Sequence, residues 1–278
     1  ACYAAINRCN VVIAGLSTAP ITAAERTPLI AEARFVRALS YFMLMQLYAR
    51  PYTDGMGSNL GVILKLNAEI TGGPNNQVRA TGTQIYAQIL ADLNAAETNL
   101  PTFYTSSPNS TLNTTRAHKN TAIALKTRVY LNMGDWASVI TEGNKLVPNA
   151  APWNAPTGVA NGLNSNIANV FTTYTTNESI LSAPFTTLDI PGTQNGLGWY
   201  YNPGPNGGGE YELNLTGNGI AADATWRATP GPTGAPLDAR RAFNIPSGAR
   251  TFLRKWTKAA ADADWSPIVR YAEVMLNI

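Results

Sequence analysis

Apolar residues at helical spacing dominate the first half of the chain. Residues 27–49 contain no glycine, and their only proline is Pro28. Thr27 followed by Pro28 predicts a helix start, because threonine caps helix N-termini and proline suits the first turn. We expect this helix to be apolar most of the way round and to lie inside a helical array. The residues predicted to be buried are Leu29, Ala33, Val36, Met43 and Leu47 in one row and Phe35, Ala38, Phe42 and Met45 in another.

Further helices follow before residue 150. Thr81–Gln84 matches a capping box ahead of a helix that reaches about residue 100. Residues 117–133 predict a helix that Gly134 ends, and Asp135 caps another helix that continues to Pro148. Two antiparallel helices joined by a Gly-Asp turn are typical of tetratricopeptide-type hairpins.

The second half of the chain is mostly loop. Glycine, proline, asparagine and threonine dominate residues 150–236, where only residues 179–185 have the pattern of a strand. Loops of this length inside a domain are usually functional. Beyond them we predict a short helix at 238–243, a strand at 250–256 and a last helix over 266–276, capped by its Ser-Pro pair.

Charge is sparse and narrows the classes of function. Lysine and arginine number 20 against 17 aspartate and glutamate, so the net charge is +3 and charged residues make up only 13%. A nucleic-acid groove needs clustered basic side chains, which the sequence lacks. The 45% hydrophobic content argues against disorder.

The cysteines predict neither a disulfide nor a metal site. On one helix Cys2 and Cys9 would lie about 10 Å apart at roughly 1.5 Å rise per residue, too far for a disulfide. The chain has one histidine, His118, so a four-ligand zinc site is not expected either. We predict no metal and no other cofactor.

Six segments, taken together, resemble a known family. They are residues 32–42, 85–96 with Leu100–Pro101, 122–131 with 134–136, 177–180, 238–240, and 268–276. Each is a common kind of helical string, but their order over nearly the whole chain resembles the SusD/RagB family, the surface-exposed glycan-binding lipoproteins of Bacteroidota.

The resemblance implies a fold and a domain organisation. We expect a mainly α protein, with a tetratricopeptide-like α-α superhelical scaffold that carries long loops and a few short strands on one side. A single SusD-like domain would cover residues 1–278, with a helical part at 1–148, a loop-rich ligand-facing part at 149–237 and a return to the scaffold at 238–278. Family members are usually longer and start with a lipidated cysteine. We therefore expect this chain to be truncated at both ends, with the lipid anchor in the missing N-terminal part.

The resemblance also implies a function without catalysis. The family binds glycan or another oligomeric nutrient, such as a peptide, at the outer-membrane surface. It delivers that ligand to a SusC-like TonB-dependent transporter. A second hypothesis stays open, in which the chain is a structural or self-assembling surface protein that uses the scaffold for protein–protein contacts. Low charge and Asn/Thr/Gly-rich loops suit packing between subunits as well as they suit sugar hydroxyls.

Charged residues within the two most family-like helices have two interpretations. Glu32 and Glu273 could serve as the carboxylate pair of a glycosidase. The favoured alternative is that the four charged residues Glu32, Arg37, Arg270 and Glu273 hold helices together, since Arg270 and Glu273 are three residues apart on one face. His118 has no obvious partners for a catalytic triad, and we expect it to face solvent near a helix start.

Aromatic residues beside short polar ones are the candidate ligand contacts. Sugar rings stack on flat aromatic side chains while amides and carboxylates bind their hydroxyls. Residues 194–202 combine both types in one loop. Three shorter stretches do so more weakly, at 52–54, 153–154 and 226–227. The candidates are Trp199, Tyr200, Tyr201, Asn195, Tyr52, Asp54 and Trp153. For each aromatic the alternative stays open that it only anchors a loop to the helical core.

Other motifs are predicted to be structural. Trp136, Trp256 and Trp265 lie in or beside the family segments and are expected in the core. The run Gly204–Gly209 lacks the Gly-Lys-Ser/Thr ending of a phosphate-binding loop and is predicted to be a flexible loop. Residues 61–66 predict a short extended piece within the Gly/Asn-rich segment that follows residue 50.

Overall fold

The computed structural model describes residues 1–72, 76–190, 196–213, 219–220, 223–227, 238–257 and 263–278. They form two units, each described by itself. Unit 1 contains residues 1–163 and 269–278, and unit 2 contains residues 164–268. Unit 1 is mainly helical, whereas unit 2 consists of short helices and strands joined by loops. The mainly α fold class predicted from the sequence is confirmed.

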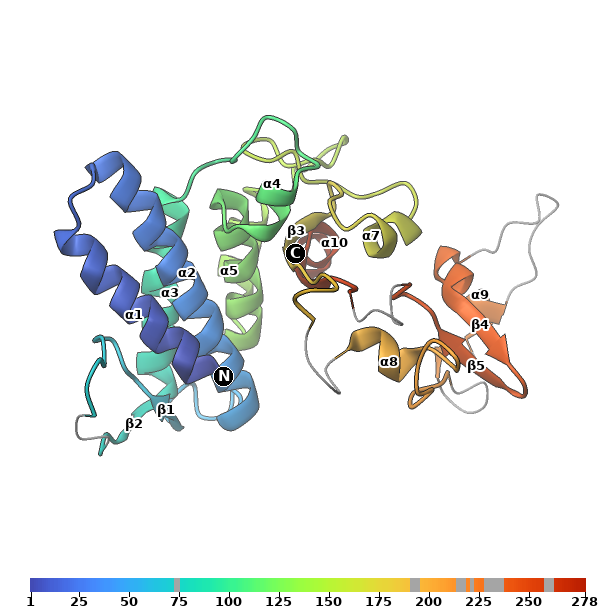
Figure 1. The fold of residues 1–278 in the computed structure, drawn as a ribbon, viewed down its shortest axis with the longest axis horizontal. Helices are drawn as coiled ribbons and strands as arrows, with labels where there is room; N and C mark the ends of the chain where they lie inside the picture. Colours follow the sequence, from blue (N-terminus) through green and yellow to red (C-terminus); the bar gives the residue numbers. More distant parts are fainter. Residues whose placement is uncertain (73–75, 191–195, 214–218, 221–222, 228–237, 258–262) are drawn as a thin grey trace. The chain divides into compact units, whose positions relative to one another are not determined.

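Unit 1 is an array in which helices pack on their neighbours in the sequence. Contacts join α1 to α2, α2 to α3, α3 to α5 and α5 to α6, and α10 packs on α5 and α6. Figure 1 shows α1, α2, α3 and α5 side by side. Successive pairing of this kind is the pattern of tetratricopeptide-like solenoids. The helices are α1 (Cys2–Thr18), α2 (Ala23–Tyr48), α3 (Gly82–Asn99), α4 (Thr111–Thr115), α5 (Lys119–Met133), α6 (Trp136–Gly143) and α10 (Tyr271–Asn277). A short antiparallel pair, β1 (Leu60–Ile63) and β2 (Arg79–Thr81), completes the unit.

The start of α2 differs from the prediction. Its N-cap is Thr22, whose side chain accepts a hydrogen bond from the Glu25 N–H while the Glu25 carboxylate accepts from the Thr22 N–H. This reciprocal capping box satisfies two otherwise unpaired donors, so it begins the helix ahead of Thr27. The predicted start at Thr27 is therefore wrong, and Pro28 lies inside the helix.

Other predicted helix ends are confirmed. Thr81 and Gln84 form the capping box of α3. Gly134 ends α5 in the left-handed conformation, at φ +73°, which glycine adopts without steric cost. Asp135 then caps α6 by accepting a hydrogen bond from the Ser138 N–H. The prediction that this helix reaches Pro148 is wrong, because α6 ends at Gly143.

Burial along α2 follows only one of the two predicted rows. The row of Phe35, Ala38, Phe42 and Met45 is buried. In the other row Ala33 is buried, but the large side chains are exposed, Leu47 by 68%. These exposed side chains follow one another along α2 at intervals of seven, seven and four residues, so they form one narrow stripe. The contacts of α2 with α1 and α3 leave this stripe open. The exposed members of the stripe are Leu29, Val36, Met43 and Leu47.

A buried ion pair joins the first three helices. The Arg37 guanidinium on α2 donates from Nε and Nη2 to the two carboxylate oxygens of Asp92 on α3, at 2.8 and 2.7 Å. Its Nη1 donates to Oδ1 of Asn10 on α1, at 2.8 Å. All three side chains are buried. The predicted role of Arg37 in holding helices together therefore has a specific geometry.

A second charge cluster joins α3, α5 and α6. Lys126, buried on α5, forms ion pairs with Glu97 and with Glu142, the latter at 2.9 Å. Lys145 contacts the same two carboxylates, each at 2.8 Å. Two positive and two negative groups thus alternate. Burial by itself would raise the pKa of Glu97, but hydrogen bonds from Lys126 and Lys145 outweigh it and hold that pKa below its usual value.

The last predicted helix is shorter than expected. Residues Ser266–Arg270 form strand β6, which pairs with β3 (Ser179–Ala183), and α10 begins only at Tyr271. The Ser-Pro pair therefore does not cap a helix. The β-branched residues Ile268 and Val269 suit a strand, and pairing with β3 satisfies backbone groups that a helix would have used.

Unit 2 gathers short elements around a small core. Besides β3 and most of β6 it contains α7 (Ala168–Thr172), α8 (Leu197–Tyr201), α9 (Ala224–Arg227), the 3₁₀ helix η2 (Ala239–Phe243), β4 (Asn244–Ser247) and β5 (Arg250–Leu253). Strands β4 and β5 form an antiparallel hairpin. Val170, Phe171 and Phe243 form the core cluster, and the rings of Phe171 and Phe243 meet edge to face at 5.4 Å. The predicted strand at 179–185 and the predicted short helix at 238–243 are both confirmed in shortened form.

Two single-residue expectations are wrong. His118 is fully buried at the N-cap of α5 instead of facing solvent. Trp136 is 62% exposed on the first turn of α6 instead of lying in the core. Both side chains lie close to the start of a helix. The sequence does not reveal whether another segment covers a side chain at such a position.

We predict that Asp92→Asn destabilises the protein strongly. The variant keeps the side-chain shape but leaves the Arg37 charge buried without its counter-ion, which costs about 3–5 kcal/mol of unfolding free energy. Denaturant titration of the wild type and the variant measures this. Asp54→Asn is the matched control, because its pair with Arg50 is exposed and its loss should change stability little. Equal effects of the two substitutions would contradict the prediction.

We also predict a pH dependence that originates at Glu97. The pKa of Glu97 is lowered in the folded protein, so its stabilising contribution is complete above the ordinary value of 4.5 and is lost as the pH falls through the lower folded value. Unfolding free energies measured from pH 7 down to pH 3 should fall more steeply for the wild type than for Glu97→Gln. Parallel curves for the two proteins would show that Glu97 carries no such contribution.

Candidate functional site

Glu32 links α2 to the segment that precedes α5. Its carboxylate accepts hydrogen bonds from Arg116, at 2.7 and 3.0 Å, and from the Tyr104 hydroxyl. The Arg116 guanidinium also lies over the Tyr104 ring, 4.3 Å from its centroid. Burial, together with the hydrogen bond to Glu32, raises the pKa of Tyr104. A carboxylate held by two donors is a structural connection and is poorly placed to exchange protons with a substrate.

Glu273 is engaged in the same way at the other end of the array. On α10 it accepts hydrogen bonds from Nε and Nη2 of Arg128 on α5, both at 2.5 Å. Arg270 occupies the N-cap position of the same helix. The nearby Tyr271 hydroxyl donates to the Leu146 carbonyl at 2.8 Å. These contacts attach α10 to α5 and to the residues after α6, so Glu273 does join helices. The expectation that Arg270 and Glu273 share one helical face is wrong, because Arg270 ends strand β6 and α10 begins after it.

Tyr52 and Asp54 lie in the turn that follows α2, in unit 1. The Tyr52 ring packs edge-on against the buried Tyr86 of α3, with centroids 5.0 Å apart. Asp54 forms an exposed ion pair with Arg50 at 2.5 Å. Tyr52 is therefore used as an anchor for the turn, and only part of its ring is accessible.

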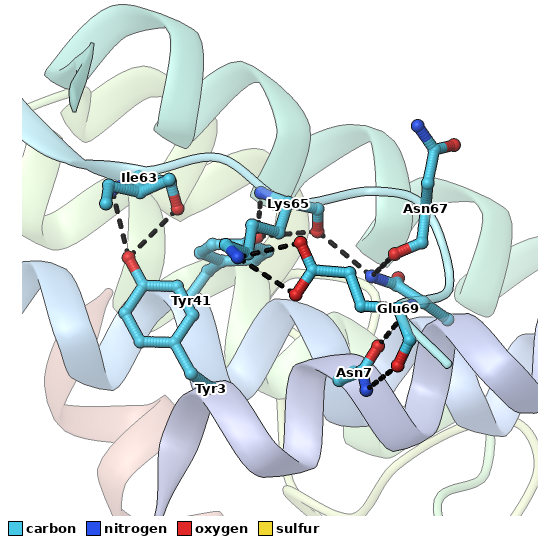
Figure 2. A network of polar contacts seen from close by, with 8 residues as sticks. Tyr3, Asn7, Tyr41, Ile63, Lys65, Asn67 and Glu69 are labelled. Carbon is cyan, nitrogen blue, oxygen red and sulfur yellow. Dashed lines mark hydrogen bonds and ion pairs between the residues drawn. The ribbon is translucent and has the colours of Figure 1, made fainter. Parts of the chain in front are cut away.

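The extended segment 63–69 is held to α1 and α2 by side chains that replace a neighbouring strand (Figure 2). The Tyr3 hydroxyl accepts from the Ile63 N–H and donates to the Ile63 carbonyl, both at 2.9 Å. The Tyr41 hydroxyl does the same for Lys65, at 2.7 Å. Burial raises the pKa of Tyr41 to about 12, so it remains a hydroxyl at neutral pH.

Two asparagines of α1 extend this ladder. The Asn7 amide exchanges a pair of hydrogen bonds with the backbone of Glu69, and Asn10 donates to the carbonyls of Lys65 and Asn67 (Figure 2). Lys65 and Glu69 add an ion pair at 2.7 Å. The polar side chains of this region therefore have protein partners, and the network is a connection within unit 1.

An apolar groove of about 680 Å³ lies beside this network. Tyr48, Leu47 and Val62 are among the side chains that line it. Its wall offers few polar groups that could bind sugar hydroxyls, so a glycan is a poor match. The lining residues are Ala1, Cys2, Tyr3, Leu44, Leu47, Tyr48, Gly61, Val62, Ile63 and Arg79.

Trp153 is half-exposed in the loop after α6, in unit 1. Trp199, Tyr200 and Tyr201 lie on α8, in unit 2, and Asn195 lies outside the described residues. The structure thus brings three of the seven candidates together on one short helix. The other described candidates belong to separate places in unit 1.

The three α8 aromatics belong to a larger group that we call the aromatic platform, defined as Trp199, Tyr200, Tyr201, Tyr211 and Trp256. The Tyr211 ring lies 5.9 Å from that of Tyr200 and 5.4 Å from that of Tyr201. The Trp256 ring lies 4.8 Å from that of Tyr201. Trp199 is 49% exposed and Tyr211 57% exposed. Apolar side chains that are exposed next to one another, unlike singly exposed ones, often mark a ligand or partner site.

Asn202 holds two parts of the platform together. It is buried, and its amide donates to the carbonyl of Gly198 on α8 and to the carbonyl of Trp256, at 3.0 and 2.9 Å. One side chain therefore ties the helix to a residue more than fifty positions later in the chain. Burial against fixed backbone carbonyls makes the platform a preorganised surface.

Polar groups surround the platform. Glu212 and Arg250 form an exposed ion pair at 2.6 Å, and Arg250 also donates to the Gly209 carbonyl. The guanidinium lies 4.8 Å from the centroid of the Phe252 ring. Glu210 is exposed beside them. Aromatic faces next to charged and amide hydrogen-bonding groups are the combination that binds sugars.

Sequence reasoning missed Tyr211 and Arg250. Tyr211 follows a glycine run, and the only sign of its role was the Tyr-Glu-Leu pattern that ends a loop rich in aromatics. Arg250 was included only as part of a predicted strand. The approach of Tyr211 to α8 depends on how the chain folds back after residue 202, and Arg250 meets Glu212 across 38 positions of the chain. No local pattern encodes either contact.

Metal binding and membrane spanning find no support in the part of the chain that the structure describes. There, no three His, Cys, Asp or Glu side chains gather closely enough to hold a metal ion. None of the described helices combines the length and the apolar composition needed to cross a membrane.

Comparisons with known proteins identify relatives of this chain. Residues 1–131 match the family model SusD-like_3, described as "Starch-binding associating with outer membrane". No curated protein gives a match. Among solved structures, a SusD superfamily protein from Bacteroides fragilis is 30% identical with a TM-score of 0.81, over 99% of this chain and 57% of its own.

More distant structures share the fold. A SusD superfamily protein from Bacteroides thetaiotaomicron is 22% identical with a TM-score of 0.74, over 99% of this chain and 59% of its own. A laminarin-binding SusD-like protein is 19% identical with a TM-score of 0.67, over 99% of this chain and 64% of its own. The chain therefore spans somewhat less than two thirds of the length of these relatives.

Proposed function

Because the chain belongs to the SusD superfamily, we propose that it binds glycan at the cell surface without chemical conversion and delivers it to a SusC-like TonB-dependent transporter. The observation that carries the proposal is the exposed aromatic platform of unit 2. The family description names starch and the outer membrane, and one structural relative is named for binding laminarin. Both of those ligands are uncharged glucans.

The proposed binding mode uses stacking and hydrogen bonds. The open faces of Trp199 and Tyr211 would contact the C–H faces of sugar rings, and Glu210, Glu212 and Arg250 would bind hydroxyl groups. The platform is held in place before a ligand arrives, so little conformational entropy is lost on binding. Glu32 and Glu273 are engaged by arginines, which supports binding without hydrolysis.

A position at the outer membrane is part of the proposal and is supported by the family description. The lipid anchor is proposed only from the resemblance to the SusD/RagB family. A peptide could use the same aromatic and polar groups, so the ligand class is broader than glycan. Glycan is favoured because the groups around the platform carry charges of both signs. A site for a charged ligand would carry mainly the opposite charge, whereas a site for an uncharged ligand needs no excess of either sign.

The second candidate function, protein–protein assembly, has its own observation. The stripe of Leu29, Val36, Met43 and Leu47 leaves large apolar side chains open on α2, and Trp136 and Leu276 are exposed on α6 and α10. Exposed apolar faces of this kind often mark interfaces. This candidate predicts a polymer or stable oligomer, whereas the delivery function predicts a complex with a transporter.

We predict that removing the open aromatics weakens glycan binding. Trp199→Ala and Tyr211→Ala should each raise the dissociation constant about tenfold or more, because each removes a stacking face worth on the order of 1 kcal/mol beyond its buried area. Calorimetric titration with laminarin, soluble starch and a panel of other oligosaccharides and peptides measures this. Trp136→Ala, which removes an exposed tryptophan in unit 1, is the matched control and should bind as the wild type. The proposal fails if no ligand in the panel binds, or if Trp199→Ala and Tyr211→Ala bind normally.

Two measurements test both the transporter as a partner and protein–protein assembly as the alternative function. We expect the purified chain to have a monomer mass by light scattering, and the native protein, isolated from cell envelopes by mild detergent, to carry a TonB-dependent transporter with it. A regular polymer in electron micrographs, with no transporter recovered, would favour the assembly function instead.

A further inference from the structure

The chain after α8 folds back along that helix. The Gly208 N–H donates to the Trp199 carbonyl at 2.7 Å, and the Gly209 N–H donates to the Asn202 carbonyl at 2.9 Å. The Tyr211 N–H donates to the Tyr200 carbonyl at 3.0 Å. These bonds satisfy carbonyls at the C-terminal end of α8 that would otherwise have no partner. The run predicted to be a flexible loop is therefore an ordered turn bound to the helix that carries the platform.

Only residues without a side chain fit at two positions of this turn. A Cβ at Gly207 would lie 2.7 Å from the Trp199 carbonyl oxygen and would also collide with the carbonyl oxygen of Asn202. A Cβ at Gly208 would lie 2.7 Å from Nε1 and 3.0 Å from Cε2 of the Trp199 indole. The glycine Cα atoms thus lie directly against the backbone and the ring of one platform residue.

The approach of Gly208 is to the N–H edge of the indole. Trp199 is half-exposed, and Gly208 is itself exposed. No described residue accepts a hydrogen bond from Trp199 Nε1. A buried indole N–H usually has a partner within the protein, whereas this one is left as a donor toward solvent.

Resting on the proposed function, we propose that Gly207 and Gly208 are positioning residues for ligand binding. They hold the Trp199 ring against the turn and keep its indole N–H open, so that Trp199 both stacks on a sugar ring and donates a hydrogen bond to a ligand hydroxyl. Gly207 sets the position of the Trp199 backbone, and Gly208 leaves the space in which the hydroxyl approaches the N–H.

The test combines an indole NMR signal with binding. Protein labelled with ¹⁵N at tryptophan gives one indole N–H signal per tryptophan, and Trp199→Phe identifies that of Trp199 by its disappearance. We expect this signal to exchange rapidly with water in the wild type. In Gly208→Ala it should change chemical shift and exchange more slowly. Gly204→Ala is the matched control, because a Cβ at Gly204 meets nothing closer than 4.0 Å in the same loop.

Binding supplies the second readout. Loss of one hydrogen bond should weaken binding of laminarin or soluble starch about two- to tenfold in Gly208→Ala, and by a similar factor in Trp199→Phe, which keeps a stacking ring. The double variant should bind no more weakly than Trp199→Phe alone, because the N–H that Gly208 protects is already gone. Trp199→Phe leaves the turn intact, so it decides the hydrogen-bond claim even if Gly208→Ala does not fold.

The outcomes separate the inference from the proposed function. An unchanged Trp199 signal in Gly208→Ala, or a slowly exchanging indole N–H in the wild type, would overturn the inference even if glycans bind. Fully additive losses in the double variant would overturn it as well. If no sugar binds the wild type, the proposed function falls, and the signal and exchange rates alone decide whether Gly208 keeps the indole edge open.

Discussion

The buried pairing of Arg37 with Asp92 and Asn10 is the constraint on which unit 1 depends. A guanidinium removed from water must have its donors satisfied, and this one is satisfied by side chains from two other helices. The position of α2 between α1 and α3 is thereby specified by the geometry of one planar group. Apolar packing alone would tolerate sliding of these helices past one another, whereas a two-pronged Arg–Asp contact does not.

The same network extends outward to the loop that follows α2. Asn10, which accepts from Arg37, also donates to the carbonyls of Lys65 and Asn67, and Tyr41 on α2 binds Lys65 as well. Segment 63–69 is therefore attached to α1 and α2 through Asn10 and Tyr41, and Asn10 in turn binds the buried Arg37. At the other end of unit 1, the alternating charges of Glu97, Lys126, Glu142 and Lys145 connect α3, α5 and α6. The chain has few charged residues, but several of them form ion pairs between the helices of unit 1. Those ion pairs fix how the helices pack against one another.

Unit 2 achieves order by different means. Its elements are short and its core is small, so hydrogen bonds from loop to helix do much of what apolar packing does in unit 1. Asn202 and the turn around Gly207 both bind α8, and among its aromatic residues Trp199 stays exposed. Loops tolerate changes in sequence better than the elements they connect, so such a turn offers a way to rebuild the platform without disturbing the helices of unit 1.

Much of the scaffold was readable from the sequence because its signals are local. The capping box at Thr81, the glycine that ends α5 and the cap at Asp135 each act within four residues, and all three were placed correctly. The order of six segments along the chain indicated the superfamily, because that order is also visible without the folded structure. The α8 aromatics could be named as candidates from the sequence, because aromatic residues beside asparagine are visible in its local composition.

Tertiary structure decided which faces are covered and which side chains meet. The apolar row of Leu29, Val36 and Met43 has the spacing of a buried face, yet α1 and α3 occupy the other sides of α2 and leave it open. His118 is buried for the converse reason, since burial depends on what packs over a residue. Tyr211 joins the platform only because the chain folds back after Asn202. By itself the sequence determined the caps at Thr81, Gly134 and Asp135 and the superfamily that the chain resembles, since those depend on neighbours along the chain. The partners of Arg37, the open stripe on α2 and the composition of the platform depend on neighbours in space, and only the folded chain decided them.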